Sequence, residues 1–156
     1  MIIVSACLLG FNCRYDGGNH PEEALFAPAL KKFLVPVCPE QLGGLSTPRA
    51  PSEIQGGDGL DVIEGKARVV SASGRDVTDC FLRGAQEIAR FMKLMEISIA
   101  IMKEKSPSCG VFHIKSGGAI LRGAGVTSAL LTKNGIRVIS SDRITDELEL
   151  TTDQVM

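Results

Sequence analysis

Three cysteines that lie far apart in the sequence each follow a short apolar run with the composition of a buried strand. Cys7 and Cys38 directly close two of these runs, and Cys109 lies in the polar loop after a third. The carboxyl ends of parallel strands share one edge of a sheet, and ligands bind at that edge. We therefore expect the three thiols to converge on one side of the molecule. The runs are residues 2–6, 34–37 and 97–102.

Three converging thiolates are suited to an iron–sulfur cluster. Structural zinc usually takes four ligands in close pairs, and the chain has no C-x-x-C pair. Iron–sulfur clusters are held by cysteine thiolates, and three ligands to a four-iron cluster leave one iron open to a substrate atom. The alternative for each cysteine alone is a small buried hydrophobic residue. The coincidence of three equivalent positions favours a shared centre.

The other two cysteines are interpreted differently. Cys80 stands beside Phe81 in a segment with helical periodicity, where a core position is favoured. Cys13 lies close to Cys7 in the sequence and has three open interpretations: a fourth ligand, a resolving thiol or a spare residue. We expect both Cys13 and Cys80 to be dispensable for cluster binding.

Polar residues next to the cysteines are candidates for proton transfer and substrate binding. Glu40 follows Cys38 by two residues, and a desolvated carboxylate at that place is suited to proton transfer. The alternative for Glu40 is a surface or salt-bridged glutamate. Ser106 and Ser108 precede Cys109 closely, and either one orients the substrate or caps a turn.

Two arginines are candidates to clamp a carboxylate or phosphate group. Arg14 stands in a turn with Asp16, and Arg49 lies in the long segment after Glu40. Guanidinium groups bind such anions through paired hydrogen bonds. We count Arg14, Asp16 and Arg49 with Ser108 as candidate substrate-binding residues. The alternative is structural pairing with Asp16 or Glu53.

The elements that must position these residues follow an α/β pattern. Four strand-like runs, the three above and residues 136–139, alternate with segments of helical character. This alternation predicts a single domain over residues 1–156, with a mostly parallel, doubly wound, Rossmann-like sheet and helices on both faces. Three helices are expected. The first begins near Pro21, and the second runs from Asp76 or Thr78 to about Met95. The third ends at a C-cap formed by Asn134 and Gly135.

Three other segments carry separate expectations. Residues 39–59 hold many Pro and Gly and predict a long irregular stretch, which in a compact domain is usually functional. Residues 62–70 predict a small hairpin that turns at Gly65 and Lys66. The tail from Asp142 is acidic, and its end is expected to fray.

Composition restricts the class of partner. The 156 residues include 17 Lys and Arg against 18 Asp and Glu, no Trp and 4% aromatic residues. This balance leaves no electrostatic footprint for a nucleic acid and few platforms for stacking bases. No apolar run has the length of a membrane span, and no signal-peptide pattern precedes the first strand. We expect a cytoplasmic protein with reduced thiols and a small-molecule substrate.

Three groups of motifs, in order along the chain, resemble the bacterial thiouracil desulfidase family. The resemblance spans residues 2 to about 142 and therefore covers most of the chain. The motifs are SACLLG (5–10) with RYDG (14–17), PVCPE (36–40) with GGL (43–45) and PR (48–49), and KSPSCG (105–110).

The resemblance implies a chemistry as well as a fold. It implies a four-iron–four-sulfur cluster on Cys7, Cys38 and Cys109, with one open iron. That iron takes sulfur from a thiolated base, leaves a carbonyl and releases sulfide. A glutamate and a serine assist in the family, and they correspond to Glu40 and Ser106. Thiouracil exemplifies the substrate class, which is a thiolated nucleobase or similar thioamide.

Two other functional classes would use the same cysteines. A cluster-free thiol enzyme or redox protein would rely on Cys7 and Cys13 and would need a lowered thiol pKa. A non-enzymatic carrier of metal or sulfur would not turn over a thiolated base. The content of iron and acid-labile sulfide separates the first class from a cluster enzyme, and turnover separates the second.

Overall fold

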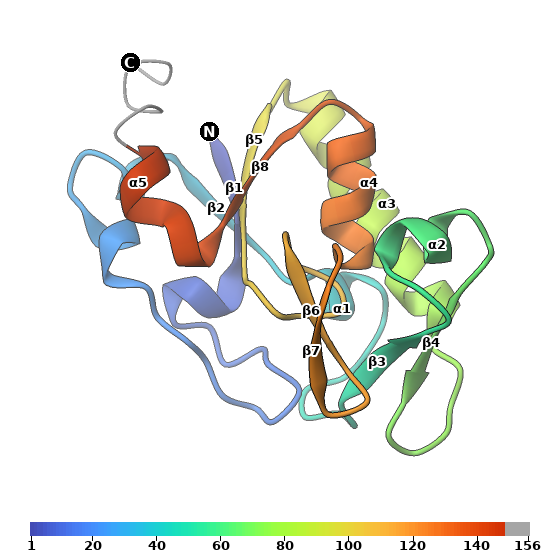
Figure 1. The fold of residues 1–156 in the computed structure, drawn as a ribbon. Coiled ribbons are helices and arrows are strands. Elements are labelled where there is room, and N and C mark those ends of the chain that lie inside the picture. Colours follow the sequence, from blue (N-terminus) through green and yellow to red (C-terminus); the bar gives the residue numbers. More distant parts are fainter. Residues whose placement is uncertain (149–156) are drawn as a thin grey trace.

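The computed structural model describes residues 1–148 and has a four-stranded parallel sheet at its centre (Figure 1). The strand order is β2-β1-β5-β8, and every neighbouring pair is parallel. The four strand-like runs in the sequence are therefore confirmed as strands. The strands are β1 (Ile2–Ser5), β2 (Leu34–Val37), β5 (Ile99–Met102) and β8 (Arg137–Ser140).

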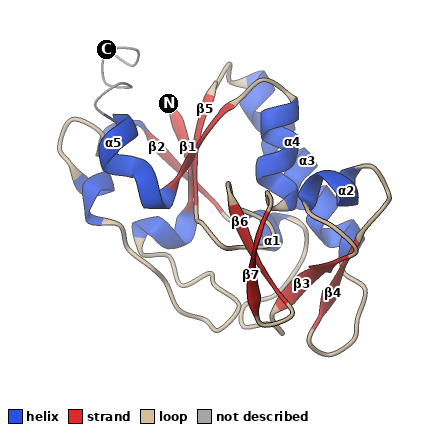
Figure 2. Ribbon diagram, in the orientation of Figure 1, coloured by secondary structure: helices blue, strands red, loops and turns tan. Residues whose placement is uncertain are grey.

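Alternate residues of the central strands pack into two different core clusters. Ile2 and Val4 pack with Leu25 and Leu30 on one face of the sheet. Ile3 packs with residues of two helices on the other face, and Figure 2 shows these two helices side by side. β1 and β5 are buried throughout, as strands covered on both faces must be. The two helices are α3 (Thr78–Leu94) and α4 (Val126–Lys133).

The structure thus confirms an α/β protein whose parallel sheet is flanked by helices. The helix expected between Asp76 or Thr78 and Met95 is α3, and Asp76 accepts a hydrogen bond from the Thr78 N–H at 3.0 Å. The expected C-cap after α4 is also present, because Asn134 is the C-cap and Gly135 has a φ of 79°. Pro36 lies in β2 at the edge of the sheet, where a missing N–H is tolerated.

The prediction of a helix that begins near Pro21 is wrong. Two short 3₁₀ turns take its place, at Glu23–Phe26 and Lys31–Phe33. Pro28 disfavours the α conformation at Ala27, which has an extended backbone with a ψ of 132°. Leu25 and Leu30 are still buried, as the expected stripe required.

The hairpin expected at residues 62–70 is also wrong. Residues Gly59–Ile63 form α2, because Asp58 and Asp61 make a capping box that begins a helix. β4 (Arg68–Ser71) pairs instead with β3 (Ser52–Gln55), in antiparallel fashion. The stretch 39–59 is therefore irregular only in part, since it contains β3 and the short helix α1 (Pro39–Leu42).

A second hairpin was not expected from the sequence. β6 (His113–Ser116) pairs with β7 (Ala119–Arg122) across a turn at Gly117 and Gly118, both with positive φ. All four residues of β7 are exposed, so the segment lacks the apolar alternation that marks a half-buried strand.

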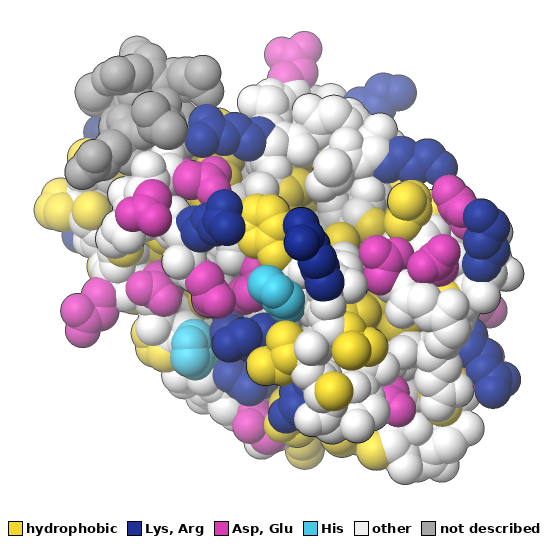
Figure 3. All heavy atoms as spheres, in the orientation of Figure 1, with side chains coloured by type: hydrophobic (Ala, Val, Ile, Leu, Met, Phe, Trp, Pro, Cys, Tyr) yellow, Lys and Arg dark blue, Asp and Glu magenta, His cyan; other side chains and the backbone are white. Residues whose placement is uncertain are grey.

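The acidic tail begins with a 3₁₀ turn at Ser141–Arg143, followed by the short helix α5 (Ile144–Leu148). The fraying expected at the end of the tail falls on residues outside the described part of the chain. In residues 1–148, none of the helices combines the length and the apolar character that a membrane span requires. Lys and Arg side chains are interspersed with Asp and Glu side chains on the face in Figure 3.

Candidate functional site

A cavity of about 570 Å³ lies at the carboxyl ends of β1, β2 and β5. Four cysteines line it, and they come from three separate segments of the chain. The antiparallel pair β3–β4 and the β6–β7 hairpin contribute further lining residues. The four are Cys7, Cys13, Cys38 and Cys109.

Each of the three strand-end cysteines reaches the cavity from its own local structure. Cys7 lies in η1, a 3₁₀ turn at Ala6–Leu9 that directly follows β1. Cys38 is the N-cap of α1 and follows β2 without a gap. Cys109 lies in the loop between β5 and β6. The structure therefore brings together the thiols that the sequence placed at three strand ends.

The N-terminus of α4 holds the loop that carries Cys109. The Thr127 N–H donates to the Ser108 carbonyl at 2.8 Å, and the Ser128 hydroxyl donates to the Cys109 carbonyl at 2.6 Å. A Cβ on Gly125 would lie 2.5 Å from the Ser108 carbonyl carbon, so this approach requires glycine. The loop is thus fixed by backbone contacts that no larger residue at position 125 would allow.

Burial dominates the protonation of the cavity thiols. It raises the pKa of Cys109 to about 12, although hydrogen bonds from Ser5 and Ser108 oppose the rise. It also raises the pKa of Cys7, which the Lys103 charge partly offsets. Burial and the neighbouring Cys38 and Cys7 raise the pKa of Cys13 to about 12. These thiols are therefore not activated nucleophiles by themselves, and a metal centre would have to displace their protons.

The donor set of the cavity is rich in cysteine thiols, the ligands that hold iron–sulfur clusters. In the described part of the chain, no three His, Cys, Asp or Glu residues are grouped closely enough to hold one metal ion. Cysteine ligands of a cluster bind different irons and stand further apart than the ligands of one ion. Three free thiols, Cys7, Cys38 and Cys109, line one cavity and are of the ligand type that a cluster requires.

Glu40 is carried by α1, which is seated on α3 through two glycines. A Cβ on Gly43 would lie 1.9 Å from the Cys80 carbonyl oxygen, and one on Gly84 would lie 1.9 Å from the Pro39 oxygen. Two helices approach this closely only where side chains are absent. The contact fixes the short helix that presents both Cys38 and Glu40 to the cavity.

The Glu40 carboxylate has a partner on each oxygen. Arg49 Nε donates to Oε2 at 2.6 Å, and the Ser108 hydroxyl donates to Oε1 at 3.1 Å. The Glu40 and Arg49 side chains are only 14% and 8% exposed. The carboxylate is thus held between the second and third cysteine motifs.

The guanidinium of Arg49 is largely used by the protein itself. Besides Glu40, it donates to the Cys13 carbonyl at 2.9 Å, to the Ser46 carbonyl at 3.1 Å and to the Thr47 hydroxyl at 2.9 Å. Glu53 was the structural partner that the sequence offered for Arg49, but its carboxylate accepts a hydrogen bond from the Gly117 N–H instead. Arg49 therefore ties the Cys13 segment to Glu40.

Arg14 and Asp16 form the turn that the sequence suggested. Arg14 Nε lies 4.0 Å from an Asp16 carboxylate oxygen that also accepts from the Gly18 N–H. Arg14 lines the cavity, whereas Asp16 is not among its lining residues. Of this pair, only Arg14 is in place to meet a molecule in the cavity.

The two serines before Cys109 make different contacts. The Ser106 oxygen accepts from the N–H groups of Ser108 and Cys109 at 3.2 and 3.1 Å. The Ser108 oxygen lies 3.5 Å from the Cys109 sulfur and donates to Glu40. Both serines line the cavity. Ser106 shapes the loop, and Ser108 makes the direct contact with Glu40.

Sequence reasoning missed one buried charged residue of this cavity. Glu104 follows β5, lines the cavity and is only 3% exposed. Burial raises its pKa, but hydrogen bonds from Ser140 and from the N–H groups of His113, Phe112 and Lys105 outweigh this and hold the pKa below its ordinary value. One feature of the sequence could have pointed to Glu104: it is an acidic residue between two lysines, directly after a run with the composition of a buried strand.

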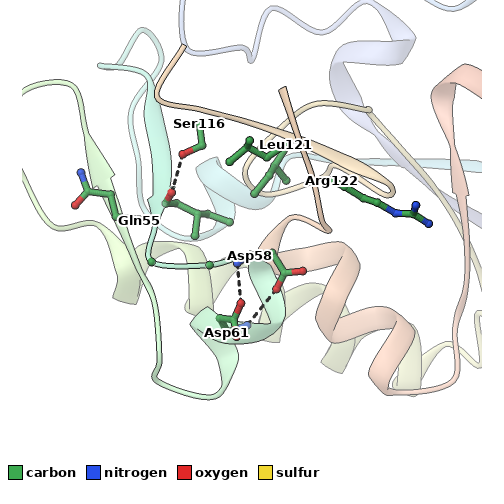
Figure 4. A pocket seen from close by; sticks show the side chains of 10 residues that line it. Gln55, Asp58, Asp61, Ser116, Leu121 and Arg122 are labelled. Carbon is green, nitrogen blue, oxygen red and sulfur yellow. Dashed lines mark hydrogen bonds between the residues drawn. The ribbon is translucent and has the colours of Figure 1, made fainter. Parts of the chain in front are cut away.

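A second hollow, of about 580 Å³, lies between α2, β3 and the β6–β7 hairpin (Figure 4). Asp58 and Asp61 line it, but both carboxylates cap α2. The Gln55 and Arg122 side chains point away from its centre (Figure 4). No cysteine lines this hollow.

Comparison with known proteins identifies relatives over nearly the whole chain. The family profile described as 2-thiouracil desulfurase matches residues 2–143. A Bacillus subtilis (strain 168) protein described as uncharacterized protein YbbK is 46% identical over 151 residues, which cover 95% of this chain and 100% of that protein. A solved structure named [4Fe-4S]-dependent thiouracil desulfidase TudS is 41% identical, with a TM-score of 0.83, over 96% of this chain and 97% of that one.

Proposed function

The chain belongs to the 2-thiouracil desulfurase family, and from this premise we propose that it is an enzyme that uses an iron–sulfur cluster to remove sulfur from a small thiolated molecule. The substrate class is a thiolated nucleobase or a similar thioamide. The reaction replaces the sulfur of a thiocarbonyl with the oxygen of water and releases sulfide. Water supplies both the oxygen and the protons, so the exchange needs no external oxidant or reductant.

The observation that carries this proposal is the meeting of Cys7, Cys38 and Cys109 at one cavity beside Glu40. The solved relative named as [4Fe-4S]-dependent supports the choice of a four-iron cluster. We propose that these three thiolates hold the cluster. When bound in this way, the cluster supplies one open, Lewis-acidic iron for the substrate sulfur.

We assign to Glu40 the task of taking a proton from the attacking water. One of its oxygens is held by Arg49, so the carboxylate keeps a fixed orientation beside the cavity. The other oxygen contacts the Ser108 hydroxyl. A base positioned in this way accelerates proton transfer by roughly 10²–10⁴-fold.

Serine and arginine side chains complete the proposed site. Ser106 fixes the loop through the N–H groups of Ser108 and Cys109, and Ser108 aligns Glu40. Arg14 is proposed to contact an acceptor group of the substrate, with Asp16 steadying its turn. We assign Arg49 to positioning, because its hydrogen bonds go to groups of the chain itself.

The proposal also covers the arrangement of the fold, the location of the protein and the class of its partner. We propose a single domain with the doubly wound, Rossmann-like arrangement, a cytoplasmic location, and a small-molecule substrate without a nucleic-acid or membrane partner.

Anaerobic purification and reconstitution test the proposal directly. We expect a brown protein with about four iron and four acid-labile sulfide atoms per chain, which releases sulfide from 2-thiouracil. Protein that stays free of iron, yet turns over the substrate, would instead support a thiol enzyme that uses Cys7 and Cys13. Protein that binds the cluster but turns over no thiolated base would support a carrier.

A further inference from the structure

The Glu104 carboxylate accepts several hydrogen bonds from the backbone of the Cys109 loop. Its Oε1 accepts from the N–H groups of Val111, Phe112 and His113 at 3.0, 3.0 and 2.8 Å. Its Oε2 accepts from the Ser140 hydroxyl at the end of β8. One buried side chain therefore links the end of β5, the end of β8 and the start of β6.

The same residue closes the loop at its base. The Glu104 N–H donates to the Ser141 oxygen at 3.0 Å, and the next N–H, of Lys105, donates to the His113 carbonyl at 3.1 Å. The loop between these ends carries Ser106, Ser108 and Cys109. Its backbone position thus depends on both ends being held together at Glu104.

A charged acceptor suits this place for a physical reason. Three successive N–H groups point at one oxygen, and buried N–H groups without a partner are strongly disfavoured. Hydrogen bonds to an ionised carboxylate are stronger than neutral ones. Core packing of Cys109 and Val111 and backbone contacts with α4 hold the middle of the loop, and the hydrogen bonds of Glu104 hold the end of the loop that leads into β6.

We propose that Glu104 is a positioning residue that holds the Cys109 thiol toward the cavity in register with Cys7 and Cys38. This inference rests on the proposed function, because the register matters for a group that all three thiols share. Residues that orient metal ligands from outside the coordination shell typically change metal affinity or activity by about 10–100-fold when they are replaced.

The first test measures how fast iron passes from the anaerobically reconstituted protein to a chelator. We expect Glu104→Ala to release iron about 10–100-fold faster than the unaltered protein, with a weaker visible absorption of the cluster. Glu104→Gln keeps one oxygen for the three N–H groups, so we expect an intermediate rate. An unchanged rate for Glu104→Ala would overturn the proposal.

Two controls separate positioning from general loss of stability. Val62→Ala removes a buried side chain from the core cluster under α2, which contains none of the three proposed ligands, and Asp76→Ala removes a carboxylate that accepts one N–H at the start of α3. All variants are compared at temperatures equally far below their own Tm. If Val62→Ala released iron as fast as Glu104→Ala, Glu104 would have no positioning role.

A second test works without any iron. Cys109 is 5% exposed, so iodoacetamide should label it slowly in protein prepared without iron. We expect Glu104→Ala to raise the labelling rate of Cys109, measured by mass spectrometry, while that of Cys80 stays constant. This test still decides the role of Glu104 if the unaltered protein binds no iron, in which case only the proposed function fails. An unchanged rate at Cys109 contradicts the proposal.

Discussion

The cysteine-lined cavity and the hollow beside α2 have nearly equal volumes, about 570 and 580 Å³, but very different linings. The first collects four cysteines and Glu40 at the carboxyl ends of the parallel strands. In the second, the carboxylates of Asp58 and Asp61 already serve the helix α2. The comparison shows that volume alone does not mark a site. What distinguishes the first hollow is a set of thiols that form no disulfide in the described part of the chain.

The largest expected effect comes from removing a proposed ligand. Cys38→Ser should lower both iron content and sulfide release from 2-thiouracil to background, because a serine hydroxyl is a poor substitute for a thiolate toward iron. The measurement is iron per chain after anaerobic reconstitution, followed by a sulfide assay. Full iron content and full turnover in this variant would remove Cys38 from the cluster and break the contrast between the two hollows.

A smaller but still large effect is expected at the proposed base. Glu40→Gln should keep the cluster and lower the single-turnover rate by roughly 10²–10⁴-fold, because an amide cannot accept the proton. The ion pair with Arg49 is the alternative role. If that role were the whole function of Glu40, stability or substrate affinity would fall while the rate at saturation stayed near normal.

The second hollow should respond through stability alone. Asp58→Asn removes the charge of a side chain that accepts from the Leu60 and Asp61 N–H groups. The free energy of unfolding should fall by no more than about 2 kcal/mol, the upper range for loss of an N-cap, and iron content and turnover per folded chain should not change. Denaturant unfolding and a sulfide assay check this together. A selective loss of turnover would show that the second hollow serves the reaction.

The smallest effects are expected at the two remaining cysteines. Cys13→Ser and Cys80→Ser should each keep the iron content of the unaltered protein. Cys13 shares the cavity with the proposed ligands, so it is the stricter test, and Cys80 on α3 is its control. Loss of iron with Cys13→Ser alone would make Cys13 a fourth ligand and would close the proposed open iron.

Patterns that depend on neighbours in the chain were predictable. The apolar β-branched runs became the strands of the parallel sheet, and helical periodicity placed α3 correctly. Elements without such a pattern were not predictable. β7 is fully exposed, and α2 begins at a capping box that was interpreted as part of a loop. The helix expected near Pro21 failed because a single proline outweighed the favourable residues around it.

Residue type and position after a strand are local properties, so the candidate residues for the chemistry could be proposed before the fold was known. The sequence by itself determined that Cys7, Cys38 and Cys109 follow three strands, and that these strands suit a buried sheet. It left the choice between Ser106 and Ser108 open, and it did not single out Glu104.

The contacts of these residues could not be read from the sequence, since they depend on segments that are distant in the chain. Ser108 reaches Glu40 across 68 positions, and Glu104 reaches Ser140 across 36. Such contacts depend on strand order and on the close approach of backbones at Gly43, Gly84 and Gly125. Residue type alone shows neither the partner of a hydrogen bond nor the glycine that allows it.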